Sequence, residues 1–399
     1  MRTNYNPIAH YAGFKGPVNN LRYSSTAPKI RSVGWTLGDS CPNKCAHCYS
    51  ITARRAGQNL TKEMVDRIIN ELRLNRIKTV NLGGNEPIFT NGLDHKKSLL
   101  PYITENLVKN KIAVGLTTSG ISLLILERYY PHVLRLLNDV DISFDSPREP
   151  EHNKNRGAKI FKDALKALKL CEKRDMPRSI VMCAMNWNFT PDRITELVSL
   201  AKEHGAYIRI NPIKPVEKRH MKLFLKAEQY YSGFSLLMKL CKSVEVGEPP
   251  LAVLSGKSAT TGCPCGTTSF RIHSMVGGKV PVSPCPYLHD YKAGDLLTNK
   301  LKDIIKSPEF SVFRVRNKHP KLIEGCKNCE FLSSCRGGCA ARSYLHNAHS
   351  GKAINFFTRD PYCPEDNNIT KGPKIGKRAS GNVKLVHKGY LCTWIGKPN

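Results

Sequence analysis

Residues 41–48 read Cys41-Pro42-Asn43-Lys44-Cys45-Ala46-His47-Cys48, a loop with three cysteines that follows an apolar segment at 32–37. Three thiolates in one tight loop can hold three irons of a four-iron cluster and leave the fourth iron without a protein ligand. Such an open iron is a binding point for a substrate or a cofactor. The alternative is a structural zinc site, which needs four ligands. His47 could be the fourth, but its place between two of the cysteines would strain the loop.

Regularly alternating segments surround this loop and predict an α/β fold. Apolar runs typical of strands alternate with amphipathic stretches whose apolar residues recur at spacings of three and four. Strands are expected at 32–37, 77–82, 111–118, 140–144, 179–184 and 207–210, and helices at 62–75, 122–137, 160–174 and 192–204. Six such units with right-handed crossovers predict an open, barrel-like parallel sheet. A parallel barrel places its chemistry in the loops at the carboxyl ends of its strands.

The composition limits the class of protein. The 399 residues include 62 Lys and Arg against 32 Asp and Glu, so the net charge is +30, and 40% of the residues are hydrophobic. This length allows two domains with their own cores. The sequence has no run of about 18 uncharged apolar residues and no apolar signal segment behind Arg2, which predicts a cytoplasmic protein without membrane spans. In that compartment the 15 cysteines are expected to stay reduced, so metal binding is the first hypothesis.

A second group of cysteines lies in the last third of the chain. Eight of them fall between Cys263 and Cys363, which is two complete sets of four. The stretches at 248–291 and 326–363 have little periodicity. Because such segments would struggle to build a core, metal clusters are expected to cross-link them.

The scattered cysteines and the end of the chain are expected to have other roles. Cys171 and Cys183 are predicted to be buried as small apolar side chains. Cys392 could be an extra ligand or a reactive thiol, but a cysteine in such a tail is more often neither. Beyond Glu365 the chain is rich in Lys and Gly, which predicts a mobile or partner-docking end.

The cysteine loop resembles the cluster motif of radical S-adenosylmethionine (SAM) enzymes. Cys41, Cys45 and Cys48 have the spacing of that motif, and further matches follow at successive predicted strand ends. The matching segments are Gly83-Gly84-Asn85-Glu86-Pro87, Thr117-Thr118-Ser119-Gly120, Ser143-Phe144-Asp145 and His152-Asn153-Lys154-Asn155-Arg156-Gly157. The first departs from the family's Gly-Gly-Glu-Pro turn by one inserted residue, Asn85.

The resemblance assigns contacts with SAM to these segments. The turn that contains Gly83 is expected to bind the amino group of the SAM methionine, with Glu86 supplying a carboxylate to the ammonium. The Ser143 position is expected near the ribose. The planar guanidinium of Arg156 is expected to pair with the SAM carboxylate. The full set of cofactor-binding candidates is His47, Gly83, Gly84, Asn85, Glu86, Thr118, Ser119, Ser143 and Arg156.

The second cysteine group resembles the SPASM region, an auxiliary-cluster domain of radical SAM enzymes that modify peptides and proteins. The match is Cys326-x2-Cys329-x5-Cys335-x3-Cys339 followed by Cys363, with Cys263, Gly278 and Cys285 upstream. By the family's ligand sharing, one cluster takes Cys263, Cys265, Cys285 and Cys339, and the other takes Cys326, Cys329, Cys335 and Cys363. The resemblance thus implies three [4Fe-4S] clusters and SAM as cofactors. Two structural zinc sites remain the alternative, because sites of four thiolates suit zinc as well.

The resemblance covers about residues 31–365 and implies an architecture and a reaction. A partial (β/α)6 TIM-like barrel at 31–245 is expected to precede the SPASM domain at 246–365, with an extension at 1–30 and a basic tail at 366–399. In such enzymes a reduced cluster splits SAM, and the resulting 5′-deoxyadenosyl radical removes a hydrogen atom from the substrate. The protein's own task is to position that hydrogen and to exclude water.

A ribosomally made precursor peptide is the expected substrate, because relatives with a SPASM region mostly modify peptides or protein side chains. Excision of a tyramine unit to leave an α-keto-β-amino acid, cross-linking and epimerisation are all open. A sulfatase maturase, which oxidises Cys or Ser to formylglycine, is the alternative, although those enzymes carry an aspartate where this chain has Pro286. A basic nucleic-acid binder would explain the charge, but the charges are dispersed and no RNA-binding motif occurs. A structural metal protein would leave the SAM-site matches unexplained.

A maturase of this kind is expected to work with partner proteins. Only about 30 residues precede the first predicted strand, too few for a leader-binding domain. A separate small recognition protein is therefore expected to hold the leader of the precursor as an added strand. The positive surface is expected to steer an acidic leader or partner toward the barrel. A flavodoxin or a ferredoxin is the expected electron donor.

Overall fold

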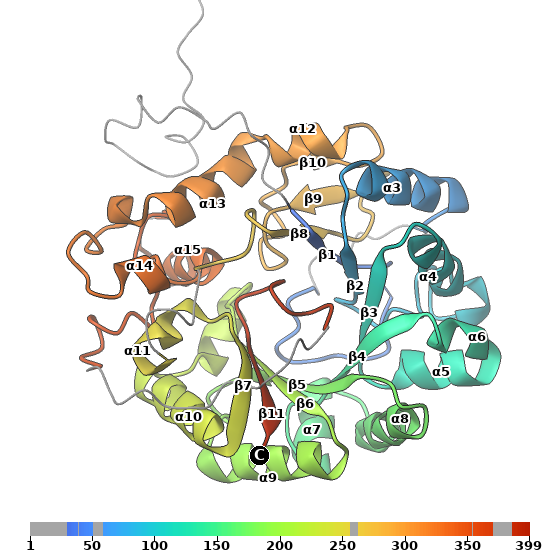
Figure 1. The fold of residues 1–399 in the computed structure, drawn as a ribbon, viewed down its shortest axis with the longest axis horizontal. Coiled ribbons are helices and arrows are strands. Elements are labelled where there is room, and N and C mark those ends of the chain that lie inside the picture. Colours follow the sequence, from blue (N-terminus) through green and yellow to red (C-terminus); the bar gives the residue numbers. More distant parts are fainter. Residues whose placement is uncertain (1–29, 39, 51–58, 256–261, 353, 370–384) are drawn as a thin grey trace, which may run out of the picture.

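A parallel sheet organises the first half of the chain (Figure 1). The structure, a computed structural model, describes residues 30–38, 40–50, 59–255, 262–352, 354–369 and 385–399. The six strands are β1 (Ser32–Trp35), β2 (Thr79–Leu82), β3 (Ala113–Thr118), β4 (Leu137–Ser143), β5 (Arg178–Ala184) and β6 (Tyr207–Pro212). They pair side by side in chain order and all run parallel. The expected six-stranded parallel barrel is therefore confirmed.

Helices on the outside of the sheet connect these strands. They are α3 (Lys62–Leu74), α4 (Leu100–Lys109), α5 (Ile121–Tyr129), α6 (Pro131–Leu134), α7 (Glu149–Arg156), α8 (Phe161–Lys173) and α9 (Pro191–Glu203). The Thr61 side chain caps α3 by accepting a hydrogen bond from the backbone N–H of Met64. The prediction of a single helix at 122–137 is wrong. Pro131 cannot continue a helix and restricts the residue before it, so α5 stops and β4 already starts at Leu137.

The second half of the chain extends the same sheet. Strand β8 (Ser269–Ile272) pairs parallel with β1, and β9 (Pro281–Ser283) and β10 (Gly294–Asp295) follow antiparallel. The remaining elements are α10 (Ala227–Leu240), β7 (Cys241–Val246), α11 (Ala252–Ser255), α12 (Leu301–Ile305), α13 (Pro308–Lys318), α14 (Leu332–Cys335) and α15 (Ala340–His349). Short 3-10 helices span His95–Lys97, Lys218–Leu223, Pro249–Leu251 and Pro320–Leu322. In Figure 1 the orange helices α13 to α15 lie on the side where the sheet does not close on itself.

The end of the chain is part of the barrel. Strand β11 (Trp394–Pro398) lies between β6 and β7 and pairs antiparallel with both. Trp394 and Ile395 are fully buried. The prediction of a mobile or docking tail is therefore wrong for residues 385–399, because this stretch carries apolar side chains that complete the barrel core. The Lys-rich part of the tail at 370–384 lies outside the described residues.

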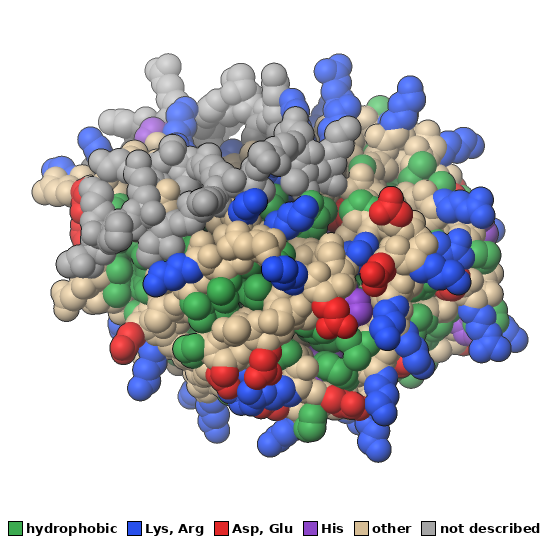
Figure 2. Space-filling view, turned by 60° about the horizontal axis from the view of Figure 1, so that its bottom comes forward, with side chains coloured by type: hydrophobic (Ala, Val, Ile, Leu, Met, Phe, Trp, Pro, Cys, Tyr) green, Lys and Arg blue, Asp and Glu red, His purple; other side chains and the backbone are tan. Residues whose placement is uncertain are grey.

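Charge is spread over the surface. Figure 2 shows Lys and Arg side chains distributed across the described part of one face, with Asp and Glu between them. This pattern agrees with the dispersed charge of the sequence. Within the described parts of the chain, none of the helices has the length and apolar character needed to cross a membrane.

Candidate functional site

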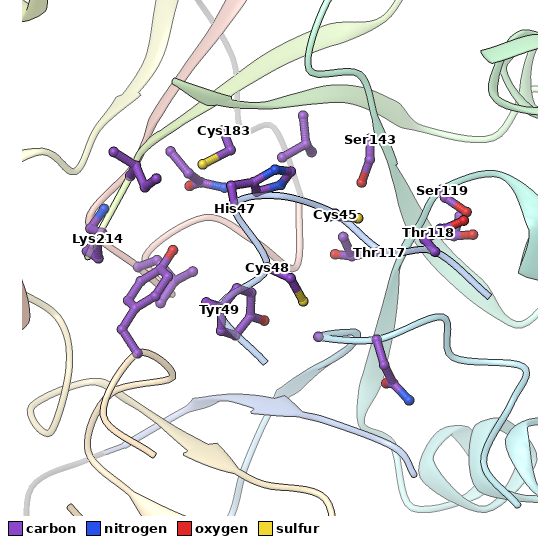
Figure 3. Close-up of a pocket in the computed structure, with 18 of the residues that line it drawn as sticks. Cys45, His47, Cys48, Tyr49, Thr117, Thr118, Ser119, Ser143, Cys183 and Lys214 are labelled. Carbon is purple, nitrogen blue, oxygen red and sulfur yellow. The ribbon is translucent and has the colours of Figure 1, made fainter. Parts of the chain in front are cut away.

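A cavity of about 160 Å³ opens at the carboxyl ends of the barrel strands (Figure 3). Its wall is formed by the cysteine loop, by the ends of β2 to β6, by β8 and by the C-terminal segment. The lining side chains come from both halves of the chain, including Cys41, Cys45, Cys48, Asn85, Glu86, Ser143, Cys183, Lys214, Arg271, Tyr287 and Tyr390. The cavity lies where a parallel barrel is expected to hold its active site.

The cysteine loop is fastened to α7 through its backbone. The N–H of Lys44 donates to the carbonyl of Arg156, and the N–H of Ala46 donates to the carbonyl of Asn155, both at 2.9 Å. Cys45 is buried, and burial raises the pKa of its thiol to about 12. A buried thiol of this kind loses its proton when a metal binds the sulfur, because the positive charge of the metal stabilises the thiolate. The loop therefore holds its three cysteines as metal ligands would be held, around the cavity.

A buried ion pair supports this loop. The Nε of Arg156 lies 2.6 Å from Oδ2 of Asp145, and Nη1 of Arg156 donates to Sγ of Cys45 at 3.8 Å. Burial alone would raise the pKa of Asp145, but Arg156 and His47 outweigh it and lower the pKa to about 2. Asn155 bridges Asp145 and Nδ1 of His47. Arg156 thus lines the cavity with its charge already paired, which leaves it less free to bind the SAM carboxylate than the sequence indicates.

The turn after β2 contains the predicted glycine motif. Gly84 has a φ of 105°, and a Cβ at this position would lie 2.3 Å from Nη2 of Arg271. Only glycine allows this close approach. The guanidinium of Arg271 donates to the carbonyl of Gly83 at 2.6 Å and holds the turn from the side of β8.

Glu86 is saturated by hydrogen bonds from the next strand end. Its carboxylate accepts from the side chains of Thr118, Ser119 and Ser122 and from the backbone N–H groups of Ser119 and Ser122. Because Ser122 lies in the first turn of α5 and Thr118 ends β3, Glu86 caps that helix and joins the turns that follow β2 and β3. The expectation that Glu86 offers its carboxylate to an ammonium is therefore not supported by its contacts.

Asn85 has a free acceptor in the same turn. Its side-chain nitrogen donates to the carbonyl of Ser40 at 3.2 Å, and its Oδ1 is buried without a hydrogen-bond partner among the described residues. The Oδ1 atom of Asn211, which also lines the cavity, is in the same state. Buried oxygens without partners are costly, so these atoms suit a ligand that brings N–H or O–H donors. This fits SAM, whose ammonium and hydroxyl groups are such donors.

The other predicted contacts lie on one side of the cavity. Figure 3 shows Thr118, Ser119 and Ser143 together at the ends of β3 and β4, with Cys45 and Cys48 beside them. The side chain of His47 is next to this group, and burial lowers the pKa of its ring. All nine predicted cofactor-binding residues are thus close to the cysteine loop, although Gly83 itself does not line the cavity.

The eight cysteines from Cys263 to Cys363 form two groups. Thiol group 1 contains Cys263, Cys265, Cys285 and Cys339, which are all buried, and thiol group 2 contains Cys326, Cys329, Cys335 and Cys363 around a smaller cavity. These are the two sets that the resemblance implies. Cys392, expected to have no such role, lies in group 1, where its thiol contacts those of Cys263 and Cys339. Strand β11 brings it there, which sequence spacing could not show.

Several cavity residues were not predicted. Cys183 was expected in the core, but it lies at the end of β5 and lines the cavity. Lys214 follows the end of β6, so the rule that strand ends carry chemistry could have found both. Tyr287 lies close to Cys285 in the chain, and the Lys214 ammonium is 5.2 Å from the centre of its ring. Tyr390 has no sequence signal, because only the folded C-terminal segment brings it to the site.

Comparison with known proteins agrees with this arrangement. The radical SAM superfamily matches residues 35–201, and the SPASM iron-sulfur cluster-binding domain matches residues 263–330. Mycofactocin maturase MftC of Mycolicibacterium smegmatis is 27% identical over 348 residues, which are 83% of this chain and 82% of that protein.

Solved structures share the fold. The enzyme anSMEcpe with bound AdoMet superposes with a TM-score of 0.62 at 19% identity, covering 85% of this chain and 95% of the other. SuiB of Streptococcus suis, bound to the precursor peptide SuiA, gives a TM-score of 0.57 at 15% identity, covering 84% and 76%. The family matches imply SAM and iron-sulfur clusters as cofactors, and the cavity and its thiols suit them. The chain thus contains a radical SAM domain that is followed by a SPASM domain.

Proposed function

We propose that this enzyme modifies a ribosomally made precursor peptide. The observation that carries the proposal is the cavity, whose wall joins the cysteine loop to residues adjacent to thiol group 1. Tyr287 and Leu391 are such residues, because they lie close in the chain to Cys285 and Cys392. A peptide side chain in this cavity would lie between the SAM site and an auxiliary site. A mycofactocin maturase and SuiB, the latter bound to a precursor peptide, support a peptide as the substrate class.

The proposed cofactors are SAM and three [4Fe-4S] clusters. Cys41, Cys45 and Cys48 hold the first cluster, and thiol groups 1 and 2 hold the others. When bound, the first cluster and SAM supply one-electron chemistry that can remove a hydrogen atom from an unactivated carbon. In this assignment the Oδ1 of Asn85 accepts from the SAM ammonium. Ser143 lies on the ribose side.

The remaining wall of the cavity suits a substrate. Tyr49 packs edge-on against Tyr287 with ring centres 5.1 Å apart. Lys214 is buried, and its ammonium lies 3.1 Å from Oε1 of Glu248, so it adds no free charge to the wall. Figure 3 shows Lys214 and Tyr49 on the side away from Ser143 and Ser119. This leaves the SAM side polar and the opposite side largely aromatic, as a site for a peptide side chain would be.

The type of modification is a finer proposal. Excision of a tyramine unit is our first choice, followed by cross-linking and epimerisation. Pro286 in place of the aspartate of sulfatase maturases argues against oxidation to formylglycine. The mass of the product separates these outcomes, since excision removes a whole unit, cross-linking removes hydrogens and epimerisation leaves the mass unchanged.

The proposal is tested by following deuterium from the peptide into 5′-deoxyadenosine. The anaerobically reconstituted enzyme is given SAM, a strong reductant and a precursor peptide deuterated at one residue type at a time. Deuterium in the 5′-deoxyadenosine, seen by mass spectrometry for one residue type, supports the proposal and names the target residue. SAM cleavage that transfers no deuterium from any residue of the peptide would contradict it.

We also propose a separate leader-binding protein and a flavodoxin or ferredoxin as electron donor. The net charge of +30 supports electrostatic association with an acidic leader or partner. Because the Debye length falls from about 10 Å at 0.1 M salt to about 3 Å at 1 M, association should slow with added salt. Stopped-flow measurement of binding rates tests this, and rates without salt dependence would contradict it.

A further inference from the structure

Five thiols, one more than a four-iron cluster needs, meet at thiol group 1. Cys263, Cys265, Cys285, Cys339 and Cys392 are each at most 7% exposed. The thiol of Cys392 contacts those of Cys263 and Cys339, and these two also contact each other. The contacts of Cys265 are with Cys263 and Cys285. If Cys263, Cys285 and Cys339 are kept in common, the group offers two sets of four, one with Cys265 and one with Cys392.

The contacts among the thiols favour Cys392. Cys339 precedes α15, Cys285 follows β9 and Cys392 precedes β11, so these three come from separate segments. A four-iron cluster binds one thiolate at each of its four irons, so its ligands lie close together around it. Cys392, Cys263 and Cys339 all contact one another, whereas the contacts of Cys265 are with Cys263 and Cys285.

The backbone around Cys392 is held in place on both sides. Its carbonyl accepts a hydrogen bond from Nζ of Lys214 at 3.2 Å. The hydroxyl of Thr393 donates to the carbonyl of Ile210 at 3.0 Å. The N–H of Gly247 donates to the carbonyl of Thr393 at 2.7 Å. A thiol on such a fixed backbone is positioned as a metal ligand requires, without reorganisation on binding.

Positive charge surrounds the same group. The buried Lys214 and Arg342 both interact electrostatically with Cys339. Arg342 is shared by the carboxylates of Glu248 and Asp360. A cluster held by four thiolates is anionic, and nearby cations offset the cost of burying that charge. The surroundings of group 1 are therefore suited to an anionic cluster.

We propose that Cys392 ligates the cluster at thiol group 1, in the position that the family resemblance gives to Cys265. The four ligands are then Cys263, Cys285, Cys339 and Cys392. This inference rests on the proposed cluster at group 1. It makes the C-terminal strand a part of the auxiliary site, with Tyr390 and Leu391, the two residues before the ligand, in the wall of the cavity.

The test compares Cys392→Ala with Cys265→Ala in the full chain after anaerobic reconstitution. Iron per chain and the electron paramagnetic resonance spectrum of the reduced protein are the readouts, and neither depends on turnover. Cys392→Ala should lose about a third of the iron, or keep it with a changed spectrum, because one of about three clusters loses a ligand. Cys265→Ala should keep both. Cys392→Ser, which preserves the volume of the side chain, guards against a loss caused by misfolding.

Cys241→Ala is the matched control. Cys241 is 1% exposed and pairs with Pro398 of the same strand β11, so it reports the effect of removing a buried thiol beside that strand. Iron loss in Cys265→Ala would overturn the inference, as would an unchanged spectrum and iron content in Cys392→Ala. If the parent protein holds no iron at group 1, both the proposed cluster and this inference are wrong. If the parent protein holds iron there and Cys392→Ala changes nothing, only this inference is wrong.

Discussion

Thiol groups 1 and 2 are built in opposite ways. Group 2 is assembled by one continuous stretch between Cys326 and Cys363, around a small cavity. Group 1 collects thiols from segments between Cys263 and Cys392, and they touch one another. The difference shows that local spacing can specify a metal site only when one segment supplies all its ligands. Where several segments converge, the fold decides which thiols meet.

The largest expected effect concerns neither group but the cysteine loop. Replacing Cys41, Cys45 and Cys48 together by Ala should reduce 5′-deoxyadenosine formation more than 100-fold, an effect of about 3 kcal/mol or more on the barrier. Chromatography of reactions with SAM and a strong reductant measures it. Cys171→Ala, a buried thiol in α8, is the control and should cleave SAM normally. Unchanged cleavage in the triple variant would refute the assignment of the loop.

Loss of the cluster at thiol group 2 should be separable from loss of SAM cleavage. Cys326→Ala with Cys335→Ala is expected to remove about four of about twelve irons per chain, because both ligands belong to one cluster. SAM cleavage should persist in part, since the cysteine loop is untouched. Iron and zinc analysis together with 5′-deoxyadenosine measurement checks this. A parent protein with about four irons and with zinc in both groups would mean that the auxiliary region is structural.

The cluster at thiol group 1 should depend on the contacts of His387, which hold the C-terminal segment at 385–399 against the barrel. Nδ1 of His387 lies 3.0 Å from a carboxylate oxygen of Asp139, and Nε2 lies 3.0 Å from one of Asp141. Gly115 makes room for this segment, because a Cβ there would lie 3.1 Å from the His387 ring. His387→Ala should lower the free energy of unfolding by about 2 to 4 kcal/mol, because it removes both buried contacts, although Arg209 still pairs with Asp141 and the N–H of Val386 still donates to Asp139.

Chemical denaturation of the reconstituted protein measures this loss. His132→Ala is the matched control, because His132 forms an exposed ion pair with Glu105 and its loss should cost less than about 1 kcal/mol. We further expect His387→Ala to lower the iron content of group 1 and to spare group 2. Equal free energies of unfolding for the two variants would show that His387 does not hold the C-terminal segment in place.

The smallest expected effect is a pH dependence of the free energy of unfolding. It comes from Glu245, which binds the C-terminal segment through the N–H of Gly389. Burial raises the pKa of Glu245 to about 7, although the N–H of Gly389 and the charges of Arg209 and Lys388 oppose the shift. Between pH 4.5, its ordinary pKa, and about 7 the folded state holds a proton that the unfolded state has lost. Stability therefore falls as the pH rises through this window, on the order of 1 kcal/mol per pH unit.

Glu245→Gln should flatten this dependence, because glutamine does not titrate. The difference between the unfolding free energies of parent and variant, measured from pH 5 to pH 8, isolates Glu245 from the histidines that also titrate there. A constant difference over this range would show that Glu245 does not carry the shift.

The sequence predicted the barrel well because each strand and helix is specified locally. The alternation of apolar runs with amphipathic stretches indicated all six strands from β1 to β6, and helix 160–174 was placed within a residue of α8. The break at Pro131 was missed, since the apolar periodicity continues across it. Strand β11 was missed because it is short and follows a polar stretch, and its partners, β6 and β7, are far away in the chain.

The same distinction between local and long-range information applies to the candidate functional site. The sequence by itself determined the cysteine loop and the glycine turn, because spacing within a segment fixes which side chains can share one ligand. The family resemblance supplied the division of the eight other cysteines into two sets of four. Only the tertiary structure decided that Glu86 caps α5, that Arg156 is paired with Asp145, and that Cys392 joins group 1. These outcomes depend on contacts between segments far apart in the chain. Local patterns carry no information about such contacts, since they arise only when the sheet brings its strand ends and the C-terminal strand together.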